Sequence, residues 1–239
     1  MNVEVRRSPR DSGTAEAGGP GMTGPVEARS AGPGPRVLPC GADALLVEVD
    51  SLAAVLGLDT ALADLNHPGI LETVPAARTV LVRVDPALLP LDRARTLLCG
   101  IDVAPQSPVP GRSVVIEVSY DGPDLEDLAA ALGMGSGELI ARHTRSEWRC
   151  AFIGFVPGFA YLVDGDPALR CPRRPEPRVR VPAGAVALAG EYAAVYPRAS
   201  PGGWQLIGRT DARMWDPDRA DPALILPGDR VVFRPREAR

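Results

Sequence analysis

Arginine, glycine, proline and aromatic residues gather in three short blocks of this chain of 239 residues. The blocks cover residues 154–162, 172–184 and 196–210. Proline and glycine impose or permit special backbone shapes, while arginine supplies a fixed cation that suits carboxylate and phosphate oxygens. A folding core needs no such mixture. We therefore predict a rigid-walled site for an anionic or carbonyl-bearing ligand.

The first block turns at Pro157-Gly158, because proline presets φ and glycine tolerates a positive φ. Phe159 and Tyr161 follow the turn and are predicted to form an apolar wall, with the tyrosine hydroxyl as a polar handle. Tyr161 is therefore a candidate ligand-binding residue. The alternative is a packed turn with both rings in the core.

The second block interleaves arginines with prolines. The prolines favour an extended backbone, in which alternate residues such as Arg178 and Arg180 share a face. Guanidinium groups suit carboxylate or phosphate recognition, so Arg173 and Arg178 are predicted ligand contacts. A solvated basic loop is the alternative. Gly184 ends the block and is predicted to let the backbone approach a ligand closely.

The third block contains Ser200-Pro-Gly-Gly-Trp204 and ends in Arg209-Thr210. Its two consecutive glycines are predicted to form a backbone nest, whose N–H groups converge on an anion or a developing oxyanion. The alternative is a tight corner of a β-structure with the tryptophan in the core. The candidate binding residues of this block are Ser200, Gly202, Gly203, Trp204 and Thr210. Arg209 is a candidate catalytic cation.

His143 is the candidate general acid or base, because an imidazole titrates near neutral pH. A histidine at the end of a helix can instead serve as a capping or packing residue. His67 precedes Pro-Gly in a turn and is predicted to be structural.

Other motifs exclude several classes of protein. All 26 basic residues are arginine, so the chain supplies no lysine for a Schiff base or a phosphate-binding loop. The four cysteines form no C-x-x-C pair, which argues against structural zinc, and no bound metal is predicted in this chain. Serine-hydrolase and zinc-protease motifs are absent from the sequence. A hydrolase or ATPase that works alone is therefore not expected.

The three blocks resemble the family of the B component of 5-oxoprolinase, also known as allophanate hydrolase subunit 1, which includes KipI-like carboxyltransferase-domain proteins. The resemblance runs from about Leu38 to Arg234. Arg173 and Arg178 fall on the family's Pro-Arg positions, and His143 falls on its His-Thr pair. Many relatives place a serine where this chain has Ala185.

The resemblance implies the B component of an ATP-dependent 5-oxoprolinase, which opens the lactam of 5-oxo-L-proline to give L-glutamate. It implies a large C component and a separate A component as partners, with ATP and Mg²⁺ in a site shared with a partner. Such a component is expected to be inactive alone. Two alternatives stay open. They are a KipI-like inhibitor of a sensor histidine kinase, and a subunit of a urea- or allophanate-processing amidohydrolase.

The pattern of the chain predicts an α+β protein of two domains. Residues 1–35 lack periodicity and are predicted to be a disordered tail. Residues 36–105 read as a small α/β domain and residues 106–112 as a proline-rich linker. Residues 113–236 read as mainly antiparallel β-structure, for which the resemblance implies a cyclophilin-like barrel.

Individual elements follow from periodicity and caps. Ser51 is a predicted N-cap, and Asp124 and Ser136 are predicted to cap two short helices of the larger domain. A further helix is predicted at residues 88–99. The predicted strands are 44–49, 70–74, 79–84, 113–120, 148–155, 185–189, 193–196, 204–208 and 230–234.

Composition limits the partners. The net charge of −4 argues against nonspecific binding of nucleic acid or of an anionic membrane. No uninterrupted apolar run approaches the length of a membrane span, and the N-terminal region lacks the apolar core of a secretory signal. The sequence therefore predicts a cytoplasmic protein without nucleic-acid or membrane partners.

Overall fold

The computed structural model describes residues 5–6, 35–101 and 111–236. Contacts divide the chain into two compact units, one of residues 8–106 and one of residues 1–7 with 107–239. The predicted tail over residues 1–35 and the linker over 106–112 lie for the most part outside the described residues and remain predictions.

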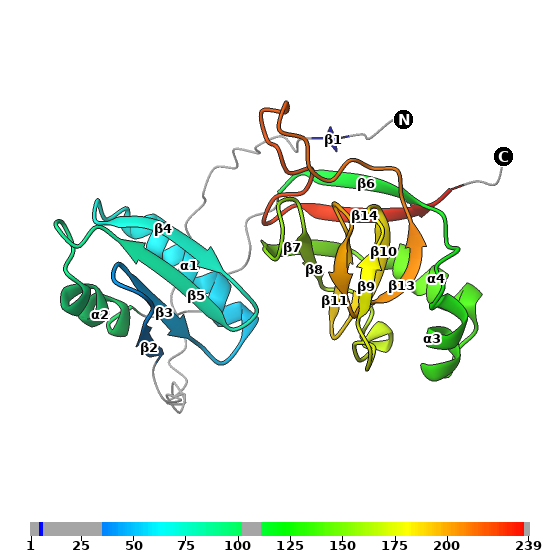
Figure 1. Cartoon of the computed structure of the whole chain (residues 1–239), viewed down its shortest axis with the longest axis horizontal. Helices are drawn as coiled ribbons and strands as arrows, with labels where there is room; N and C mark the ends of the chain where they lie inside the picture. Colours follow the sequence, from blue (N-terminus) through cyan, green and yellow to red (C-terminus); the bar gives the residue numbers. More distant parts are fainter. Residues whose placement is uncertain (1–4, 7–34, 102–110, 237–239) are drawn as a thin grey trace, which may run out of the picture. The chain divides into compact units, whose positions relative to one another are not determined.

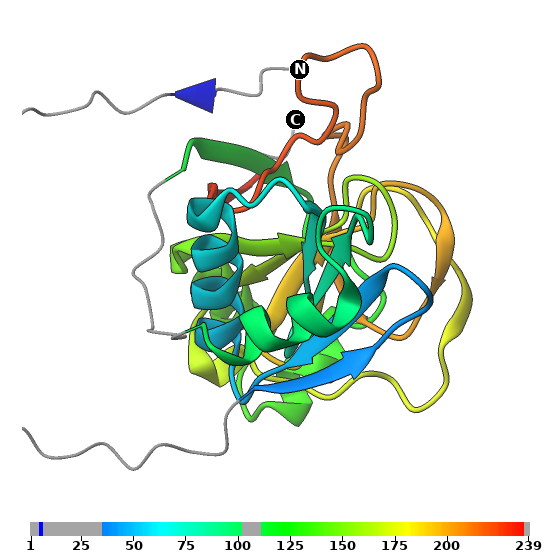
Figure 2. The ribbon, with the colours of Figure 1, turned by 90° about the vertical axis from the view of Figure 1, so that its left-hand side faces the viewer.

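The smaller unit is a four-stranded antiparallel sheet with two helices (Figure 1). The strand order is β2-β3-β5-β4. The strands are β2 (Arg36–Pro39), β3 (Ala44–Glu48), β4 (Ile70–Pro75) and β5 (Thr79–Val84). The helices, α1 (Leu52–Leu65) and α2 (Leu91–Cys99), lie against the sheet (Figure 2).

Alternation of apolar residues explains how the smaller unit folds. Val80, Val82 and Val84 of β5 point to one face and are buried with apolar residues of both helices. The predicted cap at Ser51 is confirmed, because its hydroxyl accepts a hydrogen bond from the Ala54 amide at 3.2 Å. Helix α2 begins three residues later than predicted, after Pro90.

The larger unit contains an eight-stranded sheet of order β1-β6-β14-β7-β8-β11-β10-β13. Most of its neighbours are antiparallel, whereas β14 and β6 are parallel. Hydrogen bonds between Ser119, after β6, and Arg209, in β13, bring the two ends of the sheet together into a nearly closed barrel. The strands are β1 (Val5–Arg6), β6 (Ser113–Val118), β7 (Trp148–Ile153), β8 (Ala160–Val163), β10 (Ala185–Ala189), β11 (Tyr192–Val195), β13 (Gln205–Arg209) and β14 (Arg230–Pro235). The predicted α+β class is confirmed.

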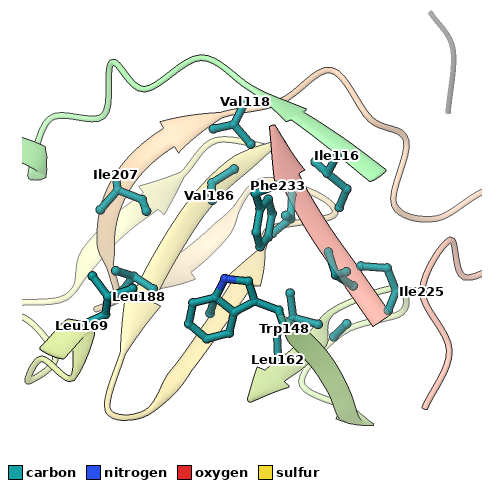
Figure 3. Packing of buried hydrophobic residues seen from close by; sticks show 14 of the residues in the cluster. Ile116, Val118, Trp148, Leu162, Leu169, Val186, Leu188, Ile207, Ile225 and Phe233 are labelled. Carbon is teal, nitrogen blue, oxygen red and sulfur yellow. The ribbon is translucent and has the colours of Figure 1, made fainter. Parts of the chain in front are cut away.

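Large apolar side chains fill the barrel. Figure 3 shows Trp148 of β7 and Phe233 of β14 among the side chains of the surrounding strands, and both are almost fully buried. In β10, Val186 and Leu188 belong to this interior core. The intervening residues of β10 face outward and are alanines, Ala185, Ala187 and Ala189. Small side chains there leave room for another layer.

That outer layer is a two-stranded ribbon that the sequence did not reveal, made of β9 (Arg178–Val181) and β12 (Ser200–Gly202). Two short helices, α3 (Leu125–Ala131) and α4 (Ser136–Arg145), and a 3₁₀ turn, η1 (Pro167–Leu169), complete the unit. The predicted cap at Ser136 is wrong, because Gly135 is the N-cap of α4. Asp124 is the N-cap of α3 as predicted, but its side chain makes no capping hydrogen bond because it is bound elsewhere.

Within the described residues, no helix is both long and apolar enough to cross a membrane.

Candidate functional site

The three sequence blocks meet on the outer face of the barrel. The second and third blocks pair as β9 and β12, with Arg178 opposite Gly202. The Arg174 amide also donates to the Gly203 carbonyl at 2.7 Å. Trp204 of the third block packs 5.4 Å from the Phe159 ring of the first block. The structure thus brings the blocks together, although not every residue within them.

An aromatic cluster forms the centre of this face. Phe159 meets Tyr161, Tyr196 and Trp204 in edge-on geometry at centroid distances of 5.0, 5.3 and 5.4 Å. Phe159 and Trp204 are buried, whereas Tyr161 is only partly buried and stacks on Phe152 at 4.5 Å. Phe159 therefore packs, while Tyr161 keeps a face toward solvent where a ligand can reach it.

The first block also carries backbone strain. Phe155 has φ of 66° although it is not glycine. The Val156 amide donates to the Gly154 carbonyl at 2.7 Å, so the residue lies at the centre of a γ-turn with positive φ, which is a rare and strained form. Phe155 is 58% exposed at this turn, and its ring lies edge-on to that of Phe159.

The arginine loop, residues 172–182, is held by the carboxylate of Asp124, which was predicted to cap a helix. The Arg178 guanidinium donates to both oxygens of Asp124, at 2.6 and 2.9 Å. Arg174 donates to the same carboxylate at 2.8 Å. The prediction that Arg178 contacts a ligand is therefore corrected. Both terminal nitrogens of its guanidinium group already donate to the buried Asp124 carboxylate.

Arg173 is the arginine of the loop that faces outward beside the aromatic cluster. Its side chain is exposed, and within the described part of the chain it makes no salt bridge. Burial raises the pKa of Tyr161 and Tyr196, and the charge of Arg173 lowers both by a smaller amount. The charge of Arg173 therefore acts on the hydroxyls of both Tyr161 and Tyr196.

An open hollow of about 450 Å³ is lined by neighbours of Arg173 and Tyr161 rather than by these two residues themselves. Tyr192 forms one wall, with its ring 5.7 Å from that of Tyr161. Pro172, the neighbour of Arg173 in the chain, forms part of another wall. The complete lining is Arg170, Cys171, Pro172, Gly190, Glu191 and Tyr192. Its lining thus offers one aromatic ring, that of Tyr192, and an ion pair between Arg170 and Glu191 at 2.9 Å.

The predicted glycine nest does not form. Gly202 belongs to strand β12, and neither it nor Gly203 is among the described residues with positive φ, so their N–H groups do not converge. Gly202 is required for another reason. A Cβ atom there would lie 2.3 Å from the Tyr196 hydroxyl. Gly203 instead offers its carbonyl to the Arg174 amide.

Of three further predicted residues, Gly184 and Thr210 support the backbone. Gly184 has φ of 78°, and a Cβ atom there would lie 2.2 Å from the Thr210 carbonyl oxygen. Its amide donates to Tyr196, so it is not free for a ligand. The Thr210 hydroxyl accepts a hydrogen bond from the Ala212 amide at 3.1 Å. Ser200 is buried, and its hydroxyl has no hydrogen-bond partner in the part of the chain that the structure describes.

Arg209 lies apart from the hollow described above. Its side chain is 70% exposed and pairs with Asp121 at 2.8 Å. Asp121 lines a second hollow, of about 400 Å³, together with the acidic first turn of α3. The predicted catalytic arginine is thus engaged by Asp121 and does not line the first hollow.

His143 does not fit the catalytic role predicted for it. The side chain has no exposed surface, and its ring lies 4.4 Å from that of Phe233 in the barrel core. Its Nδ1 atom forms a 2.7 Å hydrogen bond with the Tyr120 hydroxyl. Burial lowers its pKa to about 3, so it is neutral at physiological pH. A side chain without surface cannot reach a substrate, so we assign His143 to packing.

Metal ligands do not cluster in this region. Among the residues described, no group of three or more His, Cys, Asp or Glu side chains is arranged to hold a metal ion. The residue that sequence reasoning missed is Asp124. Its only sequence signal was a position before a short helix, which predicts a cap equally well.

Comparisons with known proteins place the chain in a family. The family model described as "Carboxyltransferase domain, subdomain C and D" matches residues 35–225. A protein from Escherichia coli O157:H7, named as the B component of 5-oxoprolinase, is 39% identical over 177 residues, which are 72% of this chain and 81% of that protein. The chain belongs to the 5-oxoprolinase B-component family.

Other members of the 5-oxoprolinase B-component family are matched over a smaller share of their length. A relative of the same name from Bacillus subtilis (strain 168) is 39% identical over 135 residues, which are 55% of this chain and 56% of the relative.

Solved structures share the fold. The structure of TTHA0988 has a TM-score of 0.67 and 39% identity, and it covers 82% of this chain but only 40% of its own. The urea carboxylase of Kluyveromyces lactis has a TM-score of 0.65 over 85% of this chain and 22% of its own. Its identity of 19% shows a common fold alone. The urea alternative gains no further support.

Proposed function

We propose that this chain is the B component of an ATP-dependent 5-oxoprolinase, which acts in the cytoplasm with the C and A components to open 5-oxo-L-proline to L-glutamate. The observation that carries the proposal is the 39% identity to the B component of a 5-oxoprolinase across 81% of that relative's length. The outer face of the barrel, with Arg173 and Tyr161, is the part of the chain that we assign to the reaction.

The chemistry of 5-oxo-L-proline suits this face. The substrate is a small lactam that carries a carboxylate, and guanidinium groups are the preferred protein partners of carboxylates. Arg173 is exposed beside the partly buried Tyr161, and the adjoining hollow has a volume of about 450 Å³. In this proposal Arg173 binds the substrate carboxylate, and the tyrosine rings line the lactam ring.

The need for ATP follows from the substrate. An unactivated amide is a poor electrophile, and transfer of a phosphoryl group to its oxygen creates a leaving group. Phosphoryl transfer depends on positioning and on cations near the transferred group. We assign ATP and Mg²⁺ to a site shared with the large C component, to which this chain contributes the exposed Arg173 and Arg180. The chain alone is then inactive.

A reconstitution experiment tests this function. The chain is mixed with ATP, Mg²⁺ and 5-oxo-L-proline alone, then with the large component, and then with both other components, and L-glutamate is measured. We expect glutamate in the full mixture only. A stable complex that makes no glutamate would contradict the assignment of 5-oxo-L-proline as the substrate. If no complex forms, and the chain instead binds the dimerisation domain of a sensor kinase, the inhibitor function replaces this one.

A further inference from the structure

Asp124 binds more groups than a helix cap requires. Its side chain is 6% exposed, and its two oxygens accept hydrogen bonds from Arg174, from both ends of the Arg178 fork and from the Leu206 amide. The distances range from 2.6 to 2.9 Å. A buried carboxylate with all its acceptor positions filled is held rigidly, and so are its partners.

These bonds fix both ends of a short proline-rich bend. Arg174 and Arg178 flank Pro175-Glu176-Pro177 and converge on one carboxylate. The Arg174 amide is also bonded to Gly203, and Arg178 is paired with Gly202 in the ribbon. Arg173 precedes Arg174 directly. Its backbone position is therefore set by groups that Asp124 anchors.

The charges are consistent with a permanent anchor. Burial acts to raise the pKa of Asp124, but hydrogen bonds from Arg178 and the Leu206 amide, with the charges of Arg178 and Arg174, outweigh it and lower the pKa. The carboxylate is thus ionised at physiological pH, and both guanidinium groups stay committed to it.

We infer that Asp124 is a positioning residue: it fixes the arginine loop on the barrel by sequestering Arg174 and Arg178, and it thereby presents Arg173 to a carboxylate-bearing substrate. Asp124 itself touches no substrate. The inference about the substrate rests on the proposed function, whereas the inference about the loop does not.

The loop offers a direct readout that needs no ligand. Trypsin cleaves after arginine but not before proline, so the bonds at Arg173-Arg174, Arg178-Val179 and Arg180-Val181 report on loop mobility. The full-length Asp124→Asn chain keeps the shape of the side chain but loses the charge. We expect these bonds to be cleaved at least tenfold faster in this variant than in the natural chain.

Asp229 provides a matched control. Its carboxylate is also buried, and it binds Arg112 at 2.9 Å and the Leu226 amide at 2.8 Å within the same unit. Asp229→Asn should lower the melting temperature as Asp124→Asn does, but without faster cleavage in the arginine loop. Equal cleavage of the loop in both variants would overturn the inference.

Kinetic measurements in the reconstituted three-component enzyme provide a second test of the inference. Asp124→Asn should raise KM for 5-oxo-L-proline at least tenfold with a smaller change in kcat, and Asp229→Asn should leave KM unchanged. A natural KM in Asp124→Asn would overturn the presenting role. If the natural mixture makes no glutamate, the proposed function fails, while the trypsin comparison still decides the anchoring of the loop.

A milder variant covers the case in which Asp124→Asn does not fold. Arg174→Gln removes one anchor and leaves the Arg178 fork on Asp124. It should also show faster loop cleavage and a raised KM, and both changes should be smaller than those in Asp124→Asn. A folded Arg174→Gln chain with natural values for both would contradict the inference.

Discussion

At the residue scale, arginines that look alike in the sequence have different tasks. Arg174 and Arg178 hold a buried carboxylate, Arg173 faces outward, and Arg209 pairs with Asp121 elsewhere on the barrel. The extended backbone of the loop predicted that alternate arginines share a face. It did not predict that Arg174 and Arg178 bind Asp124, because Asp124 lies some fifty positions away in the sequence. Long-range pairing of this kind leaves no local signal.

Arg178→Ala and Arg173→Ala should therefore differ in stability. The first change strips a buried carboxylate of its forked partner, which costs about 3 kcal/mol of unfolding free energy. The second removes an exposed side chain and should change the unfolding free energy by less than about 0.5 kcal/mol. Urea unfolding of both variants measures the difference. Equal stabilities would contradict the roles assigned to the two arginines.

His143 should make stability depend on pH in a defined direction. Its folded pKa is about 3, below the value of about 6.5 for an unfolded histidine. Between these values the unfolded chain binds the extra proton, so stability falls as pH falls below about 6.5, with a limiting slope of about 1.4 kcal/mol per pH unit.

Urea unfolding between pH 7 and pH 5 tests this, because the window lies above most carboxylate titrations. His143→Gln should flatten the slope relative to the natural chain, and His67→Gln serves as the control. An unchanged slope in His143→Gln would show that His143 is not buried in its neutral form.

At the element scale, the ribbon of β9 and β12 explains the alanines of β10 and the glycine at position 202. The ribbon lies over the outward alanines of β10, and Gly202 leaves room for the Tyr196 hydroxyl. The sequence identified the turn residues of these blocks but assigned Gly202 and Gly203 to ligand binding. Close approach to a protein atom and close approach to a ligand demand the same residue type, so composition cannot separate them.

A double substitution tests this packing. Gly202→Ala puts a methyl group against the Tyr196 hydroxyl and should cost about 1–3 kcal/mol of unfolding free energy. Tyr196→Phe in the same chain removes the nearest clashing atom and should recover part of that loss. Additive costs in the double variant, measured by chemical denaturation, would show that the two residues do not meet as the structure places them.

The strands were predicted where apolar runs are long, and missed where they are short. β6, β10 and β14 have 6, 5 and 6 residues with consecutive apolar side chains, whereas β2, β9 and β12 have only 4, 4 and 3 residues. Their pairing comes from neighbours distant in the sequence. The closure of the barrel through Ser119 and Arg209 is likewise a tertiary feature.

At the scale of the whole molecule, the proposed function makes the chain one component of a larger assembly. TTHA0988 contains the matching region as 40% of a longer chain. In our proposal the large C component supplies the further polypeptide that completes the outer face of the barrel. The arginine loop and the aromatic cluster would then be half of a site.

The most direct test of this account is 5-oxo-L-proline turnover by the three-component enzyme with Arg173→Ala in this chain. Arg145→Ala, which changes another exposed arginine of the same unit, is the control. We expect that both variants assemble, that Arg173→Ala lowers kcat/KM at least tenfold, and that Arg145→Ala turns over substrate at the natural rate. A natural rate with Arg173→Ala in an intact complex would contradict the assignment of this face to the substrate.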